Sequence, residues 1–317
     1  MICDLITTII PVFNRSALLR EAVASVLAQD YRPIEVIVVD DGSTDETGRV
    51  AEELAARHPA EIRVLHIANG GPGAAREAGR QAAQGEFVQY LDSDDLLLPG
   101  KFTAQVAGLR ACSECGVAYG KTGYGRDTTR PWKRTGERIE AMWPSFLQAR
   151  WWDTSTPLYR REVTDAAGPW ESLRQEEDWV YDCRAAARGT RLCYIDQFVS
   201  LTGNAAPDRL SGNTASSRYW RDRAAAHRLI WECVKSVGPD FEQPELRHFA
   251  RELFLLARQC GAAGLADEAR ELFQLALAAS GPERGSSLDF RLYRMLASVA
   301  GWTQAGRLAC AMDRWRQ

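Results

Sequence analysis

Two patterns of apolar and polar positions alternate along the first hundred residues. Four short runs rich in β-branched residues predict buried strands at 5–10, 34–39, 62–67 and 86–91. Between them, apolar residues recur three and four positions apart, which predicts helices over 17–28, 44–57 and 72–84. We expect Ser43 to cap the second helix, with Glu46 completing a capping box. Strands separated by helices of this length predict an α/β fold with a mostly parallel sheet.

The pattern becomes less regular after this part of the chain. Residues 120–136 are rich in Gly, Thr, Arg and Lys, which predicts a long loop. Residues 137–195 are mixed, with helices expected near 139–149 and 177–188 and an extended stretch near 156–159. The polar stretch 205–217 is a candidate boundary. We therefore expect an α/β domain over 1–210 and an α-helical region over 215–317.

The last hundred residues show helical spacing only, with helices expected near 219–237, 244–261, 265–280 and 288–315. One copy of the tetratricopeptide pattern is formed by Leu253, Leu256, Ala257, Gly264, Ala269, Phe273, Ala276 and Leu277. One copy cannot make a solenoid, so it predicts a single helical hairpin. Between residues 291 and 316 the last helix carries five arginines and one acid, interleaved with apolar residues. Such a helix packs on the helical region, forms a dimer, or lies on an anionic membrane surface.

Composition narrows the classes of partner. The 317 residues carry a formal net charge of −3, so nucleic acid is not expected as a partner. No apolar run reaches the ~18 residues of a membrane-spanning helix, and the N-terminus lacks the basic start of a signal peptide. We expect a cytoplasmic protein, held at most peripherally at the inner face of the membrane. Its eight cysteines are interpreted as reduced thiols, since the lone pair Cys112 and Cys115 has no second pair to complete a zinc site.

Acidic clusters follow two of the predicted strands. Asp40 and Asp41 follow the second strand, and residues 92–95 (Asp-Ser-Asp-Asp) follow the fourth. Either cluster alone could be an acidic turn that caps the next helix. On one edge of a parallel sheet the carboxylates would repel one another unless a cation or hydrogen-bond donors lie between them. An Asp-x-Asp element suits Mg²⁺ or Mn²⁺.

The motifs together resemble those of a family 2 glycosyltransferase. They occur in order as PVFNR at 11–15, DDGSTD at 40–45, NGGPGAAR at 69–76, LDSDD at 91–95 and QEEDW at 175–179. The resemblance covers roughly residues 5–200. It implies the GT-A nucleotide-sugar-binding fold for the domain over 1–210, with the helices of 215–317 as an appendage. Glu77 departs from the family, which often has Asn at this position.

The resemblance also implies a role for each matching residue. Nucleotide-sugar contacts would be made by Pro11, Phe13, Arg15, Asp40, Asp41, Arg76 and Asp92. Asp94 would hold Mg²⁺ or Mn²⁺, and Asp178 would act as the general base. The implied reaction is an inverting, metal-dependent transfer from a nucleotide-sugar, chiefly a UDP-sugar, to a hydroxyl of a glycan, a lipid-linked sugar or a protein. The alternative is a catalytically idle nucleotide-sugar-binding scaffold.

The tryptophans and histidines give weaker indications of a functional site than the motifs do. Six of the ten tryptophans lie within 132–179, and we expect two or three of them to line the acceptor cleft. They are Trp132, Trp143, Trp151, Trp152, Trp170 and Trp179. The four histidines, His66 among them, lack the spacing of metal ligands or of a catalytic triad. We interpret them as surface or core residues.

Overall fold

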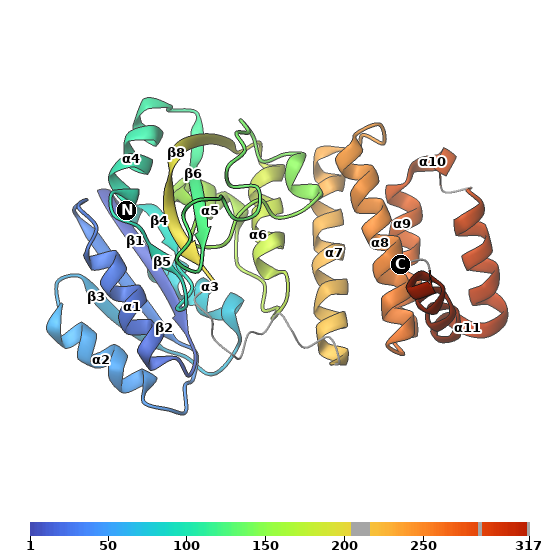
Figure 1. Ribbon diagram of the computed structural model, residues 1–317, viewed down its shortest axis with the longest axis horizontal. Helices are drawn as coiled ribbons and strands as arrows, with labels where there is room; N and C mark the ends of the chain where they lie inside the picture. Colours follow the sequence, from blue (N-terminus) through green and yellow to red (C-terminus); the bar gives the residue numbers. More distant parts are fainter. Residues whose placement is uncertain (204–215, 285–286, 316–317) are drawn as a thin grey trace. The chain divides into compact units, whose positions relative to one another are not determined.

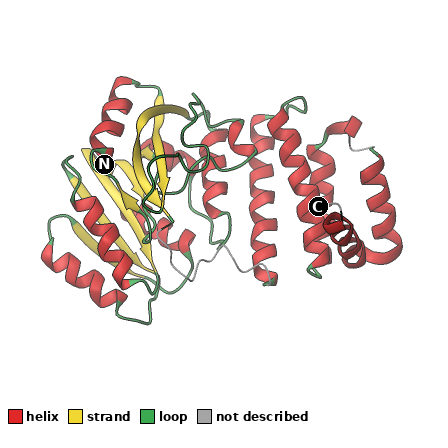
Figure 2. Cartoon of the chain, viewed as in Figure 1, coloured by secondary structure: helices red, strands yellow, loops and turns green. Residues whose placement is uncertain are grey.

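A computed structural model describes residues 1–203, 216–284 and 287–315. The chain divides into two compact units. The first comprises Met1–Met142, Arg150–Leu173 and Arg188–Arg209, and the second comprises Trp143–Ala149, Arg174–Ala187 and Leu210–Gln317. Among the described residues, the strands belong to the first unit, and the second is built from helices and loops (Figure 2). The expected boundary at 205–217 lies almost wholly outside the described residues.

The first unit is built on an eight-stranded mixed sheet with the order β3-β2-β1-β4-β7-β6-β8-β5 (Figure 1). Its strands are β1 (Ile2–Val12), β2 (Ile34–Asp40), β3 (Ile62–His66), β4 (Gly85–Tyr90), β5 (Leu96–Leu97), β6 (Cys115–Tyr124), β7 (Leu158–Arg160) and β8 (Arg191–Thr202). Strands β1 to β4 pair in parallel, as do β6 and β8, whereas β7 pairs antiparallel with both β4 and β6. The predicted α/β fold with a mostly parallel sheet is confirmed.

Helices cover both faces of the parallel strands. They are α1 (Ser16–Leu27), α2 (Thr47–Arg57), α3 (Pro72–Ala82), α4 (Lys101–Ala111) and α5 (Arg161–Ala167). Ile6 and Ile10 of β1 belong to one core with α1 and α2, while Ile9 faces α3. A Cβ placed on Gly79 of α3 would lie 2.3 Å from Ile9 Cγ2, so only glycine permits this approach. Burial on both faces explains why these strands are continuous apolar runs.

The predicted cap of α2 is wrong. This helix begins at Thr47, whose N–H donates to Asp45 Oδ1 at 2.8 Å. The Ser43 hydroxyl instead accepts the Asn14 N–H at 3.0 Å. It therefore ties the turn after β1 to the turn after β2, and the two bonded residues are 29 positions apart in the chain.

Two further predictions lie between 120 and 149: the loop over 120–136 is confirmed after Tyr124 but wrong before it, and the helix near 139–149 is wrong. The loop expected from 120 is a strand as far as Tyr124, because Thr122 is buried and bonded to Thr156 (2.6 Å) and Ser200 (3.0 Å). The helix expected near 139–149 is a single 3-10 turn, η1 (Ser145–Leu147). Pro144 cannot donate the backbone hydrogen bond that a continuous helix needs at this point. The pattern also did not predict α4, α5 and β8.

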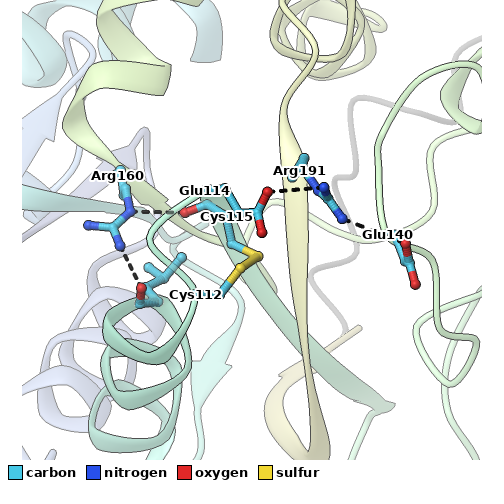
Figure 3. Close-up of a disulfide and its surroundings, with 7 residues drawn as sticks. Cys112, Glu114, Cys115, Glu140, Arg160 and Arg191 are labelled. Atoms are coloured by element: carbon cyan, nitrogen blue, oxygen red, sulfur yellow. Dashed lines mark hydrogen bonds and ion pairs between the residues drawn. A yellow bond between two sulfur atoms is a disulfide. The ribbon is translucent and has the colours of Figure 1, made fainter.

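Cys112 and Cys115 form a disulfide between the end of α4 and the start of β6 (Figure 3). Arg160 lies beside it, donating from Nε to the Cys115 carbonyl at 2.9 Å and from Nη2 to the Leu109 carbonyl at 2.5 Å. The prediction that all cysteines are reduced is therefore wrong for this pair. The other six cysteines, all within the described part of the chain, form no disulfide.

The second unit contains η1 and a set of helices: α6 (Glu177–Ala187), α7 (Ser217–Val237), α8 (Pro244–Ala262), α9 (Ala266–Ala279), α10 (Gly281–Arg284) and α11 (Leu288–Trp315). The helices expected near 177–188, 219–237, 244–261 and 265–280 are present, and the one expected over 288–315 is interrupted at Gly301. The consecutive helices α8 and α9 pack against each other, and α11 packs on both.

Helix α11 is kinked at Gly301 (φ 80°), and some of its apolar residues are packed while others are exposed. Phe290 and Tyr293 join an aromatic cluster with Phe254 and Phe273, at ring separations from 4.6 to 5.9 Å. Leu288, Leu292, Met295, Val299, Leu308 and Met312 are exposed. Packing on the helical unit therefore accounts for part of its apolar surface. Among the described residues, no helix is both long and apolar enough to cross a bilayer.

Candidate functional site

The strand ends bring the predicted donor-binding residues of the first unit to one edge of the sheet. Val12, the last residue of β1, pairs in register with Asp40 of β2, and Asp40 pairs with His66 of β3. The Leu91 N–H, directly after β4, donates to the Ile9 carbonyl at 3.0 Å. Residues that follow β1, β2 and β4 consequently emerge at the same edge, where ligands bind in parallel α/β sheets.

Asp41 fixes the loop that carries the third motif. Its Oδ1 accepts the Gly70 N–H at 2.7 Å and its Oδ2 accepts the Gly71 N–H at 2.9 Å. Asp41 is buried, and Gly71 has φ 91°, which only glycine adopts without strain. The carboxylate thus shapes the turn before α3. Direct contact between Asp41 and a nucleotide stays a prediction.

Asp40 contacts a histidine that the sequence analysis set aside. Asp40 Oδ1 accepts the Ser43 N–H at 3.0 Å, and its Oδ2 lies 3.0 Å from His66 Nδ1. The other ring nitrogen, Nε2, lies 2.8 Å from Glu52 Oε1. Hydrogen bonds to Glu52 and Asp40 raise the pKa of His66. The signal for His66 was its place at the end of the third strand, level with Asp40.

Arg76, which is buried, forms an ion pair with Asp92. Its Nη2 donates to Asp92 Oδ1 at 2.6 Å, and the Arg76 side chain is only 4% exposed. The guanidinium lies 4.8 Å from the ring centroid of Trp170. Glu77, the departure from the family motif, accepts the Trp170 N–H at 3.1 Å and pairs with Arg80. Glu77 therefore helps to hold the segment whose ring covers Arg76.

Arg15 pairs with the predicted metal ligand. Its Nη1 lies 3.1 Å from Asp94 Oδ2, with side-chain exposures of 22% and 13%. The two neighbouring predicted residues lie differently. Phe13 is 42% exposed just beyond β1, where a ring can stack on a planar base. Pro11 is buried within β1 and pairs with Val39, so it supports the strand end from inside the sheet.

Asp95 is the buried member of the acidic cluster. Its Oδ2 accepts the Ser155 hydroxyl at 2.8 Å, and the residue is buried. Burial raises the pKa of Asp95 well above its usual range, and the neighbouring carboxylates of Asp92, Asp153 and Asp94 add to the shift. Ser155 carries no motif signal in the sequence.

Hydrogen-bond donors and arginine side chains of the protein thus offset much of the repulsion expected among these carboxylates. Repulsion alone no longer requires a metal. The donor set still fits one, because Mg²⁺ and Mn²⁺ are commonly held by one or two carboxylates while phosphate and water supply the other ligands. Within the described part of the chain, three ligand atoms converge only at Cys3, Asp4 and Glu86. Arg110 pairs there with Asp4 at 2.6 Å and with Glu86 at 2.7 Å.

The predicted base, Asp178, belongs to the second compact unit. It lies half-buried in the first turn of α6, and its Oδ1 accepts the Trp179 N–H at 2.7 Å. Its neighbour Glu176 pairs with Arg223 at 2.7 Å and His227 at 3.2 Å. Burial acts to raise the pKa of Glu176, but these two partners hold it below its usual value. Glu176 is therefore committed to an ion pair.

The six tryptophans of 132–179 do not share one environment. Trp151, Trp152 and Trp170 are buried. Trp132 is 38% exposed and lies against Tyr124 at a centroid distance of 4.5 Å. The Trp179 Nε1–H donates to the Phe146 carbonyl at 2.6 Å. A role in acceptor binding stays a prediction.

Comparison with known proteins agrees with the motifs. Residues 7–162 match the model of the family described as Glycosyl transferase family 2. The uncharacterized glycosyltransferase EpsJ of Bacillus subtilis is 30% identical over 204 residues, which is 61% of this chain and 59% of that protein. Glycosyltransferase GlyG of Streptococcus pneumoniae is 39% identical over 95 residues, 30% of this chain and 31% of that one. The chain thus spans less than two thirds of these relatives.

Solved structures share the architecture. S. aureus TarS 1–349 in complex with UDP-GlcNAc is 20% identical with a TM-score of 0.74, over 98% of this chain and 92% of that one. The mannosyltransferase PcManGT from Pyrobaculum calidifontis, in complex with GDP-Man and Mn²⁺, is 20% identical with a TM-score of 0.58, over 97% and 86%. At this identity the likeness shows the fold, which is GT-A with a helical C-terminal region.

Proposed function

Because the chain belongs to glycosyl transferase family 2, we propose that it transfers a sugar from a nucleotide-sugar to a hydroxyl acceptor. The observation that carries this proposal is that the pairs Arg76–Asp92 and Arg15–Asp94 lie at the edge where the parallel strands of the sheet end. Carboxylates there suit a ribose and a cation, while guanidinium groups suit a diphosphate. The donor is a UDP-sugar, by analogy with the UDP-GlcNAc that TarS binds.

Asp94 would hold Mg²⁺ or Mn²⁺ on the donor diphosphate. When bound, the cation supplies neutralisation of the negative charge that builds up on the leaving nucleoside diphosphate. Arg76 provides a fixed positive charge at the same edge, since its side chain is buried and bonded to Asp92. The PcManGT complex, which contains Mn²⁺, supports this assignment by analogy.

Asp178 acts as the general base in this proposal. An acceptor hydroxyl is a weak nucleophile at neutral pH, and a carboxylate that takes its proton is worth about 10²–10⁴ in rate. A single attack opposite the leaving group gives inversion at the anomeric carbon. The choice of Asp178 is supported by Glu176 being committed to Arg223 and His227, and by Glu177 being buried.

We propose the domain division, location and acceptor class of the enzyme together with its reaction. Residues 1–210 form the catalytic domain and 215–317 the helical appendage of a cytoplasmic enzyme. The exposed apolar residues of α11 contact either a second copy of the chain or the inner membrane surface. The acceptor is a glycan, a lipid-linked sugar or a protein.

Donor binding is tested by calorimetry with UDP, with Mn²⁺ present or removed by a chelator. A panel of nucleotide sugars with mass-spectrometric detection then measures hydrolysis and transfer. We expect metal-dependent UDP binding and turnover of one donor. Binding without any turnover across donors and acceptors would favour an idle scaffold instead.

A further inference from the structure

The predicted metal ligand already has a cation beside it. Arg15 Nη1 lies 3.1 Å from Asp94 Oδ2, at the distance of a direct ion pair. A divalent cation bound to the same carboxylate would repel this guanidinium, since like charges a few ångströms apart interact unfavourably. We propose that Arg15 neutralises Asp94 until a divalent cation displaces it, and that the released guanidinium then binds the donor. The inference rests on the proposed function.

The two arginine–aspartate pairs of the edge differ in how readily they separate. The Arg76 side chain is 4% exposed, is bonded to Asp92 at 2.6 Å and lies against the Trp170 ring. Arg15 is 22% exposed. A partly exposed guanidinium loses little interaction energy when it moves into solvent. A buried guanidinium that moved out would leave a cavity and a carboxylate without its counterion. Arg15 is therefore the releasable cation and Arg76 the fixed one.

The backbone around Arg15 is held in place, so the exchange needs only its side chain. The Arg15 N–H donates to Thr47 Oγ1 at 2.9 Å, at the start of α2. The preceding Asn14 accepts the Thr44 N–H at 2.8 Å through Oδ1, and its own N–H donates to Ser43 Oγ at 3.0 Å. Because the turn is tied to the β2–α2 connection, rotation about the Arg15 side-chain bonds moves the guanidinium while Phe13 and Asn14 stay fixed.

The exchange predicts effects of opposite sign in one variant. In Arg15→Gln the carboxylate of Asp94 loses its competing cation, so Mn²⁺ alone should bind about fivefold more tightly. UDP at saturating Mn²⁺ should bind about fivefold or more weakly, because the guanidinium that moves to the donor is missing. A purely structural role for Arg15 would weaken both.

Free Mn²⁺ is measured by electron paramagnetic resonance during titration of the 317-residue protein without nucleotide. The matched control is Arg20→Gln, which removes the same charge from α1 at a pair with Glu53 (3.0 Å). We expect a lower Mn²⁺ dissociation constant in Arg15→Gln and an unchanged one in Arg20→Gln. Equal constants in the wild type and Arg15→Gln, no Mn²⁺ bound by either, or an equal gain in the control overturns the exchange.

Failure of the inference is distinguishable from failure of the proposed function. If the wild type binds UDP only with Mn²⁺ while Arg15→Gln leaves Mn²⁺ affinity unchanged, the function stands and the exchange is wrong. If the wild type binds no UDP or nucleotide-sugar at any Mn²⁺ concentration, the proposed function fails first.

Discussion

Replacing Trp170 by leucine removes the ring that lies 4.8 Å from the Arg76 guanidinium. Trp170 is 5% exposed and also meets Tyr90 edge-on at 4.8 Å, so the substitution leaves a cavity. We expect the free energy of unfolding to fall by about 2–3 kcal/mol, somewhat less than for truncation to alanine. Arg76 would stay bonded to Asp92 but lose its packing surface.

The effect on donor binding follows from the ring–guanidinium contact. Such a contact is worth about 1 kcal/mol when partly desolvated, which corresponds to about a fivefold change in dissociation constant. We therefore expect Trp170→Leu to weaken UDP binding about fivefold in calorimetry at saturating Mn²⁺. Trp170→Phe keeps an aromatic face and should recover most of the affinity.

Trp152→Leu is the matched control. Trp152 is fully buried in the same compact unit, where it packs against Tyr119 at a centroid distance of 5.3 Å. It should lose a similar free energy of unfolding, measured by denaturant titration, and keep wild-type UDP affinity. Unchanged UDP affinity in Trp170→Leu, or an equal loss of UDP affinity in Trp152→Leu, would show that the Trp170 ring does not support donor binding through Arg76.

Three further predictions follow from the site. Asp94→Ala should abolish the Mn²⁺ dependence of UDP binding, as measured by calorimetry with and without a chelator; a retained dependence removes Asp94 from the metal site. Asp178→Asn should keep UDP affinity but lose about 10²-fold or more in kcat, because the amide cannot accept the acceptor proton; near-normal turnover would locate the base elsewhere. Since Glu52 and Asp40 raise the pKa of His66, its ion pairs stabilise the fold fully below the unfolded pKa of about 6.5 and less as pH rises through the raised value. The difference in unfolding free energy between wild type and His66→Asn should accordingly shrink from acidic to alkaline pH, and a difference that grows contradicts the assignment.

The parallel half of the sheet was predictable because burial on both faces demands uninterrupted β-branched runs. The same criterion failed for β6, in which Thr122 is polar yet buried, with Thr156 and Ser200 satisfying its hydroxyl. Pattern alone cannot distinguish such a strand from a polar loop, since the partners lie 34 and 78 residues away.

At the site, the edge that gathers the carboxylates was predictable from strand ends, but their partners were not. The pairing of Arg15 with Asp94 depends on two turns whose geometry is set by tertiary hydrogen bonds. The contact between Asp40 and His66 depends on the register of β2 and β3. The Trp170 ring lies against Arg76, and the Trp170 backbone is held by Glu77. No local sequence pattern predicts this contact.

Transfer of a sugar from a nucleotide-sugar is tested directly by comparing turnover in the wild type and in the variant that lacks the proposed base. The wild type and Asp178→Asn are incubated with Mn²⁺ and a panel of UDP- and GDP-sugars, and released nucleoside diphosphate and glycosylated product are quantified by mass spectrometry. We expect the wild type to consume one donor, and Asp178→Asn to bind the same donor but release about 10²-fold less nucleotide. No donor consumed by the wild type with any acceptor, or equal turnover by both proteins, would contradict this expectation.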